Sequence, residues 1–231
     1  MQQENKAGER LVLTINGVEY AFRKCPAGTF MMGDGRDRHQ VTLSREFYML
    51  ETEVTQAMWE SVMVNIPSFF RGDKLPVENV SWTDCQEYVR KLNELNVAPA
   101  GFKFSLPTEA QWEYACRAGT TAAYSFGDTL TKEQANFGGS VGKTSEVRSY
   151  SANAWGLYDM HGNVLEWCSD WYGAYPSVAV TDPAGAVEGS RRVRRGGSWA
   201  NKACRSAIRL HGDPSGRNDG GGLRVSLVCE E

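Results

Sequence analysis

The sequence predicts an α+β fold, with a small mixed sheet, a few helices and much irregular loop. Three observations support this prediction. Segments before residue 50 alternate apolar and polar residues, and three segments between residues 55 and 117 repeat their apolar residues at helical spacing. From residue 118 onwards the periodicity fades, and Gly, Ser, Asn and Asp recur among scattered tryptophans.

The predicted strands lie at both ends of the chain. LVLTINGVEYAFRKC (11–25) alternates around Asn16 and Gly17, a pair that suits a two-residue hairpin because both residues tolerate positive φ. TFMMG (29–33) and HQVTLSREFYML (39–50) are further strand candidates. GLRVSLV (222–228) predicts a buried strand that returns the C-terminus to the sheet.

Two helices are expected after these first strands. The first spans residues 55 to about 64, and its apolar side carries Met58, Trp59 and Val62. The second begins at Ser81, because Asp84 three residues later completes a capping-box pattern. Its apolar stripe consists of Trp82, Cys85, Tyr88, Val89, Leu92 and Leu95.

A third helix completes the predicted elements. Thr108 and Gln111 form a second capping pair, and Gly119 is placed to end the helix after Arg117. Because no repeat, low-complexity tract or linker interrupts the sequence, we expect a flexible leader over residues 1–9 and a single domain over 10–231.

Composition narrows the class of protein. Of the 231 residues 41% are hydrophobic and 23% charged, and the net charge is -3, which excludes a wholly disordered, a collagen-like and a nucleic-acid-coating chain. No apolar stretch approaches the roughly 18 residues of a membrane span, and MQQENKAGER lacks the apolar core of a signal peptide. An engineered Met1 that replaces a removed export signal would give the same N-terminal sequence, so the sequence does not decide the cellular compartment.

The six cysteines form no CxxC pair, so the spacing of a zinc finger or a thioredoxin-like site is absent. We expect buried thiols, and the alternative is one or two disulfides in an oxidising compartment. The glutamates at 53, 109, 113 and 166 are expected to brace loop backbones, and Trp112, Trp167 and Trp199 to lie in the core.

Nine motifs occur in an order that resembles a known family. They are PAGTFMMG (26–33), HQVTL (39–43), EVTQAMW (53–59), PVENVSW (76–82), LPTEAQWEYACRAGT (106–120), GLYDMHGNVLEW (156–167), RGGSW (195–199), CRSAIR (204–209) and GLRV (222–225). The set resembles the formylglycine-generating-enzyme, or sulfatase-modifying-factor, domain and spans nearly the whole chain. The resemblance implies a variant of the C-type lectin fold in which the N- and C-terminal strands pair.

The resemblance also implies a structural calcium ion. Asp159 and Glu166 would supply carboxylates, and Gly162 and Val164 would supply carbonyls, to the oxygen shell that calcium prefers. The alternative is a hydrogen-bonded turn without an ion. A second calcium site of the family is expected to be absent, because GGSVGKTSEVRSY (138–150) lacks its aspartate.

Catalysis in the family's oxidase depends on a reactive, copper-binding cysteine pair just after the RGGS-like segment. Here Asn201 stands at the first cysteine's position and Ser206 near the second, and neither can offer a thiolate. We therefore expect no copper and no enzymatic activity. An oxidase or sulfatase modifier like the formylglycine-generating enzyme is kept as the alternative.

Two further features follow from the same resemblance. Cys204 matches a cysteine that is structural in the family's enzymes and pairs with the one matching Cys116, which implies a Cys116–Cys204 disulfide in an exported protein. His39, His161 and His211 form no HxxxH or HxxxE pair, so non-haem iron is not expected.

The C-terminal segment resembles that of the variable proteins of diversity-generating retroelements, in which selected codons are rewritten while scaffold residues stay fixed. Residues 195–228 would be the variable region, and Cys204, Arg205, Ser206, Ala207, Arg209, Pro214 and Arg217 its fixed anchors. The positions expected to contact a ligand are Ala200, Lys202, Ile208, Leu210, His211, Gly212, Asp213, Ser215, Gly216, Asn218, Asp219 and Gly220.

The function expected from this resemblance is binding, because a preorganised loop loses little entropy when it meets a ligand. The partner would be an unknown protein or other macromolecule. The arginines of RRVRRGG (191–197) are interpreted as carboxylate-pairing residues rather than a nucleic-acid track, given the net charge of -3. The resemblance implies a monomeric lipoprotein exported to the cell surface or outer membrane, attached to the membrane only through a lipid anchor. A structural or accessory surface protein is a third possibility.

Overall fold

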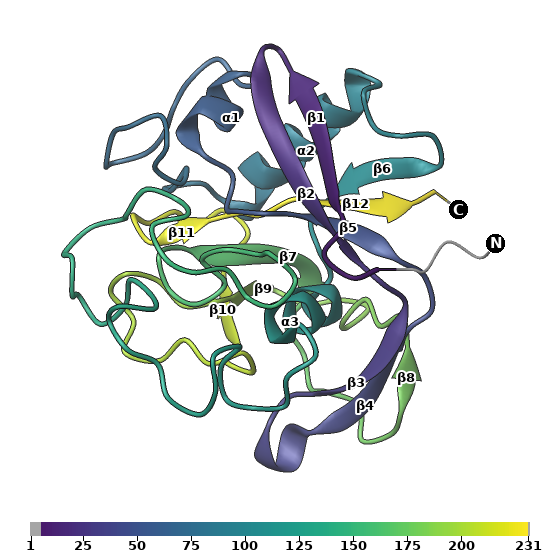
Figure 1. Ribbon diagram of the computed structural model, residues 1–231. Helices are drawn as coiled ribbons and strands as arrows, with labels where there is room; N and C mark the ends of the chain where they lie inside the picture. The colour runs from purple at the N-terminus through teal and green to yellow at the C-terminus, as the bar shows by residue number, and fades with distance from the viewer. Residues whose placement is uncertain (1–5, 231) are drawn as a thin grey trace.

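The computed structural model describes residues 6–230, in which the strands form three sheets (Figure 1). The largest has the order β1-β2-β5-β12-β6, and all its neighbouring strands are antiparallel. Its strands are β1 (Arg10–Ile15), β2 (Val18–Cys25), β5 (Phe47–Leu50), β12 (Ser226–Cys229) and β6 (Phe102–Ser105). The helices are α1 (Gln56–Glu60), α2 (Trp82–Glu94) and α3 (Glu109–Arg117), with a short 3-10 helix at Gly35–Asp37.

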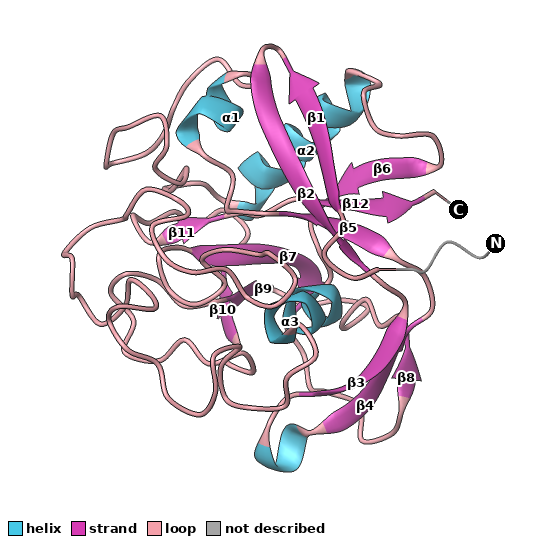
Figure 2. Ribbon diagram, in the orientation of Figure 1, coloured by secondary structure: helices cyan, strands magenta, loops and turns pink. Residues whose placement is uncertain are grey.

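Two smaller sheets contain the remaining strands. One has the order β10-β9-β7-β11, and its strands are β10 (Leu210–Gly212), β9 (Arg192–Arg195), β7 (Leu165–Trp171) and β11 (Gly221–Gly222). The other has the order β3-β4-β8, and its strands are β3 (Gly28–Met32), β4 (His39–Leu43) and β8 (Val180–Thr181). Figure 2 shows that long loops surround β7, β9, β10 and β11, so the predicted α+β class with much irregular loop is confirmed.

The first hairpin forms as predicted. Asn16 and Gly17 have φ of 47° and 83°, and Ile15 pairs with Val18 across the turn. The pairing extends beyond β1, because the backbone N–H of Gly8 donates to the carbonyl of Lys24 at 2.9 Å. Part of the predicted leader is therefore hydrogen-bonded to β2, and residues 1–5 of that leader lie outside the described residues.

The helices begin at the predicted caps. Ser81 and Asp84 form a complete capping box on α2, and Thr108 and Gln111 form one on α3. The end of α1 was predicted too late: it stops at Glu60, and Val64 is 96% exposed. The left-handed residue that ends α3 is Ala118, one position before the predicted glycine.

The C-terminal strand joins the large sheet but not in the predicted pairing. β12 lies between β5 and β6, whereas β1 pairs only with β2 among the described strands. The N- and C-terminal strands thus share a sheet without touching. The reason is that β2 and β5 lie between them, and the N–H of Leu50 at the end of β5 donates to the carbonyl of Val225 at 3.0 Å.

Two apolar clusters hold these layers together. One lies between the large sheet and α2 and includes Tyr20, Phe22, Tyr88 and Trp167. The other surrounds α3 and includes Phe47, Trp112, Met160 and Val193. Each fully buried side chain of this size contributes about 1.5–3 kcal/mol. None of the helices described is both long and apolar enough to span a bilayer.

Candidate functional site

A buried guanidinium, that of Arg195, fixes the backbone of the first half of the C-terminal segment near residues 206 and 207. Arg195 is fully buried, forms ion pairs with Glu113 and Glu109, and donates to the carbonyls of Ser206 at 2.8 Å and Ala207 at 3.2 Å. Glu113 also accepts a hydrogen bond from the backbone N–H of Gly33 at 2.9 Å. These contacts fix the segment's backbone without using its outward side chains.

His161 holds the same stretch from a second side. Its Nδ1 lies 2.8 Å from the carbonyl of Cys204, and its Nε2 lies 3.1 Å from the backbone N–H of Ser125. Nδ1 therefore carries the proton and Nε2 accepts, which is the neutral imidazole. Burial lowers the pKa of His161 to about 4 and keeps this form at neutral pH.

The second half of the segment is tied to the start of α2. Arg217 donates to both carboxylate oxygens of Asp84, and the carbonyl of Pro214 accepts from the N–H of Thr83 at 3.3 Å. The carbonyl of Asn218 accepts from the N–H of Asn79 at 2.9 Å. Arg217 and Pro214 thus act as the scaffold residues that the sequence predicted.

Most of the predicted ligand positions lie at the surface. Exposed side chains belong to Ala200, Lys202, Asp213, Ser215, Asn218 and Asp219, and half-buried residues are Ile208, Leu210, His211 and Gly216. The prediction is wrong for two glycines. A Cβ on Gly212 would lie 2.8 Å from the ring of the buried Trp167, and Gly220 is buried against Ser198. Neither position can exchange side chains freely.

Sequence reasoning missed an aromatic patch beside these positions, made of Phe69, Phe70 and Trp199. Phe69 is 73% exposed, the ring of Phe70 meets that of Trp199 edge to face at 5.9 Å, and Trp199 Nε1 donates to the carbonyl of Asp219. Trp112 and Trp167 are fully buried as predicted, whereas Trp199 is only half-buried. The adjacent phenylalanines in a loop were the signal in the sequence.

A second group of side chains surrounds β10. The ring of His211 lies 4.3 Å from that of Tyr172, and an Arg191 nitrogen lies 3.2 Å from its Nδ1. The guanidinium of Arg209 lies between the rings of Tyr172 and Tyr175, at 4.5 and 4.1 Å. Exposed aromatic and arginine side chains are the types that carry most binding energy at protein interfaces.

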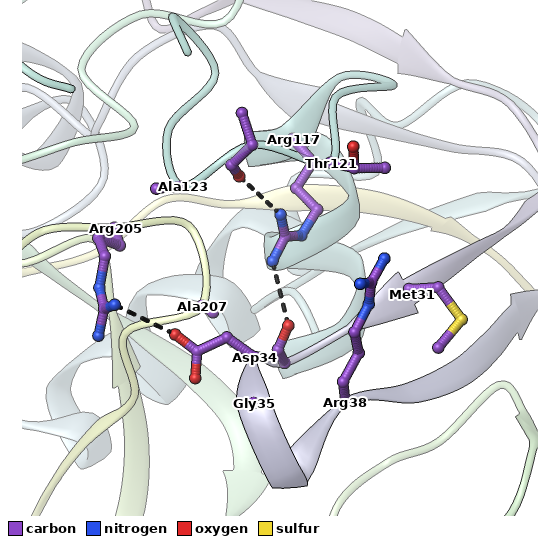
Figure 3. A pocket seen from close by; sticks show the side chains of 11 residues that line it. Met31, Asp34, Gly35, Arg38, Arg117, Thr121, Ala123, Arg205 and Ala207 are labelled. Carbon is purple, nitrogen blue, oxygen red and sulfur yellow. Dashed lines mark hydrogen bonds and ion pairs between the residues drawn. The ribbon is translucent and has the colours of Figure 1, made fainter. Parts of the chain in front are cut away.

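A pocket of about 240 Å³ lies beside the segment. Figure 3 shows its lining, with Arg205 and Ala207 on one side and Asp34 and Gly35 on the other. Arg117 at its back donates to the carbonyls of Ala122 and Gly33, and Arg205 pairs with Asp34 at 3.4 Å. Arg117 also pairs with buried Glu113 at 2.7 Å, so Arg38 is the lining guanidinium without an ion pair among the described residues. An unpaired guanidinium beside a pocket favours an anionic group.

The two carboxylates predicted to bind calcium both accept hydrogen bonds from other groups of the protein. Both carboxylate oxygens of Glu166 face the buried guanidinium of Arg224, at 2.8–3.1 Å, and Oε2 also accepts from Trp112 Nε1. Asp159 accepts from the backbone N–H of Arg148, and the N–H of Val164 donates to Glu53. Within residues 6–230 no group of three or more His, Cys, Asp or Glu side chains could hold a metal.

The turn at Gly162 agrees with the hydrogen-bonded alternative. A Cβ on this glycine would lie 2.2 Å from the carbonyl oxygen of Asn136, so the backbone segments approach too closely for any side chain. Burial raises the pKa of Asp159 to about 6. These side chains take part in a buried polar network around Arg224, and the calcium site stays a prediction.

The Cys116–Cys204 disulfide predicted from the resemblance is absent from the described residues, because both thiols are free. Cys116 Sγ instead contacts His161 Nε2 at 3.8 Å and Ser206 Oγ at 3.7 Å. Burial raises the pKa of Cys116 and of Cys204 to about 12, so neither is a thiolate at neutral pH. At the family's first cysteine position, the side chain of Asn201 accepts from Ser198.

Comparison with known proteins extends these observations. Residues 22–227 match the sulfatase-modifying factor enzyme 1-like domain. The serine/threonine-protein kinase pkn1 of Chlamydia caviae is 39% identical over an alignment of 160 residues, and the match covers 66% of this chain and 24% of the kinase. The formylglycine-generating enzyme of Streptomyces coelicolor is 38% identical over 142 residues, covering 54% of this chain and 42% of the enzyme. The chain thus spans about a quarter of the kinase's length.

Among solved structures, Treponema denticola variable protein 1 superposes with a TM-score of 0.84 at 30% identity, covering 96% of this chain and 99% of that protein. This likeness confirms the resemblance to retroelement variable proteins and the predicted variant of the C-type lectin fold. The chain belongs to the sulfatase-modifying factor enzyme 1-like family.

Proposed function

We propose that this protein is a non-catalytic, surface-displayed binding protein whose C-terminal segment presents exchangeable side chains to a macromolecular ligand. One observation carries the proposal. The backbone at residues 204–207 is fixed by buried His161 and Arg195, and the backbone at Pro214 and Asn218 is fixed by hydrogen bonds from the backbone at 83 and 79. The side chains at 200, 202, 213, 215, 218 and 219 are nevertheless exposed. A rigid backbone with free side chains separates folding from specificity.

The surface has the composition of a binding face. Trp199 precedes Ala200 in the sequence and donates to the carbonyl of Asp219, and Phe69, exposed beside Phe70, adds apolar contact area. Lys202 and Asp213 add charges of opposite sign, which select partners more than they strengthen binding. The arginine-lined pocket next to Arg205 would accept an acidic side chain of the ligand.

A loop-exchange experiment tests the proposal. In the exchange variant, Lys202, Asp213, Ser215 and Asp219 are replaced together by Ser, Lys, Tyr and Arg; in the matched control, the exposed residues Glu60, Lys103 and Lys132 are replaced by Ser. Each protein selects binders from the same phage library of random peptides. We expect melting temperatures within about 2 °C of the parent for both. The exchange variant should enrich different peptides, and the control the parent's peptides. Identical enrichment by all three proteins would reject the binding face.

The absence of catalysis is tested separately. The positions that match the family's cysteine pair hold Asn201 and Ser206, and the nearby Cys204 has a raised pKa. We expect no oxygen consumption above background with copper and a sulfatase-type cysteine peptide. Turnover that persists in a Cys204→Ser variant, and is lost on heating, would contradict this part of the proposal and favour the oxidase alternative.

A further inference from the structure

A second cavity, of about 340 Å³, lies away from the exposed ligand positions, between the start of α3, the end of β7 and the loop at 174–186. Its apolar wall includes Met32, Ala110, Val180 and Pro183. Its polar residues are His39, Glu109, Asp170, Tyr175 and Arg209. A mainly apolar cavity with a few convergent polar groups is the usual form of a small-ligand site.

Two buried carboxylates in this cavity each use only one oxygen. Asp170 Oδ2 accepts from the N–H of Glu109 at 2.8 Å and from Ser169 Oγ at 3.1 Å, whereas Oδ1 accepts no hydrogen bond from the described residues. Glu109 Oε1 accepts from Tyr175, Arg209 and Arg195, whereas Oε2 accepts none from residues 6–230. Each residue is only 2% exposed.

His39 provides a third free acceptor. It is 6% exposed, and its Nδ1 lies 2.9 Å from the carbonyl of Asp37, so Nδ1 carries the proton. Nε2 is then a lone-pair acceptor, and the described part of the chain offers it no donor. All three residues line one cavity, so a guest that enters it can donate to these acceptors.

The charges of the lining favour a cation. Arg209 is already committed to Glu109 and to the carbonyl of Gly173, and Arg195 is shared with Glu113. Asp170 has no ion pair within the described chain, and burial together with the charge of Glu109 raises its pKa to about 7. A positively charged donor beside Asp170 would stabilise its ionised form.

We propose that this cavity binds a primary alkylammonium group, with the ammonium between Asp170, Glu109 and His39 and the alkyl stem along Met32 and Val180. An ammonium has three N–H donors and no acceptor, which matches three free acceptors. The stem matches the apolar wall. The same chemistry belongs to a small aliphatic amine and to a lysine side chain of a partner, and the site is independent of the exposed positions of the proposed function.

Calorimetric titration of the intact protein with n-pentylamine tests the site. We expect saturable binding of one amine, with 1-pentanol and pentanoate at least about tenfold weaker because they lack the charged donor. Asp170→Asn should weaken pentylamine by about tenfold or more, and Glu60→Gln, a change at an exposed carboxylate, should leave it unchanged. Ala186→Leu, which fills the cavity without touching a carboxylate, should also weaken binding and serves if the Asp170 variant does not fold.

The pH dependence provides a second signature. The ammonium binds ionised Asp170, so its dissociation constant should rise by about tenfold per pH unit below about pH 7. The other charged or titratable groups that line the cavity are His39, Glu109, Tyr175 and Arg209, and Tyr175 and Arg209 both donate to Glu109. A dissociation constant that does not change with pH would contradict the proposal.

The remaining outcomes are equally decisive. Nα-acetyl-lysine methylamide binding as tightly as pentylamine identifies a lysine side chain as the guest, and weaker binding identifies a small amine. The loop-exchange variant should bind pentylamine as the parent does, so failure of the proposed binding face leaves this site standing. No binding of either amine, equal binding of 1-pentanol, or binding unaffected by both cavity variants would overturn the proposal.

Discussion

Arg217 donates to the two carboxylate oxygens of Asp84 through Nε and Nη2, at 2.7 Å each. The same carboxylate accepts from the backbone N–H of Ser81 and completes the capping box of α2. The side chain of Asp84 therefore caps the N-terminus of α2 and also holds the loop that carries Asp213, Ser215 and Asn218. The loop owes its position to a feature that also stabilises the core helix.

Replacing Asp84 by Ala removes both functions. We expect a loss of about 1–3 kcal/mol in the free energy of unfolding, because the carboxylate half of the capping box and the charge-assisted hydrogen bonds from Arg217 are lost together. Arg217→Ala keeps the cap and removes a pair whose arginine is 52% exposed, so its cost should stay below about 1 kcal/mol. Urea unfolding of the two variants measures the difference, and equal losses would show that the cap contributes nothing.

Gly212 is a scaffold position that lies among the exchangeable positions of the segment. We expect Gly212→Ala to cost about 1–3 kcal/mol, because the new Cβ overlaps the Trp167 ring and the guanidinium of Arg194. Ser215→Ala, at an exposed position three residues further on, should change stability by less than about 0.5 kcal/mol. Thermal unfolding distinguishes them. A neutral Gly212 variant would return this residue to the set of ligand positions.

His161 predicts a specific acid sensitivity. Its pKa is about 4 in the folded protein against an ordinary value of 6.5, so the unfolded chain binds the proton more tightly. The contribution of His161 to stability should therefore fall as the pH decreases from about 6.5 to about 4, by up to about 3 kcal/mol, against the opposite contributions of Asp159 and Asp170, whose pKa values burial raises. His161→Gln should flatten this part of the profile, and His211→Gln at the surface should not. A profile unchanged by His161→Gln would argue against a buried neutral imidazole.

Local features of the fold were predictable from the sequence, and distant contacts were not. The hairpin at Asn16 and the cap at Ser81 depend on residues within a few positions of each other, so short patterns predicted them. Arg195 with Glu113 joins positions 82 apart, and the pairing of β12 with β5 depends on the whole sheet. Exposure at the C-terminal segment was predicted from family anchors, but the packing of Gly212 on Trp167 has no sequence signal.

The buried pair of Glu166 and Arg224 leads to a prediction about calcium. A ligand that binds the folded state alone raises its stability as its concentration exceeds the dissociation constant. Because Glu166 already accepts from Arg224 and Trp112, added calcium or a chelator should shift the melting temperature by less than about 1 °C. Arg224→Met should destabilise the protein by about 3–5 kcal/mol, since it leaves Glu166 buried and unpaired. A clear stabilisation of the parent by millimolar calcium, abolished by Glu166→Gln, would instead show that the carboxylate exchanges its arginine for a metal ion.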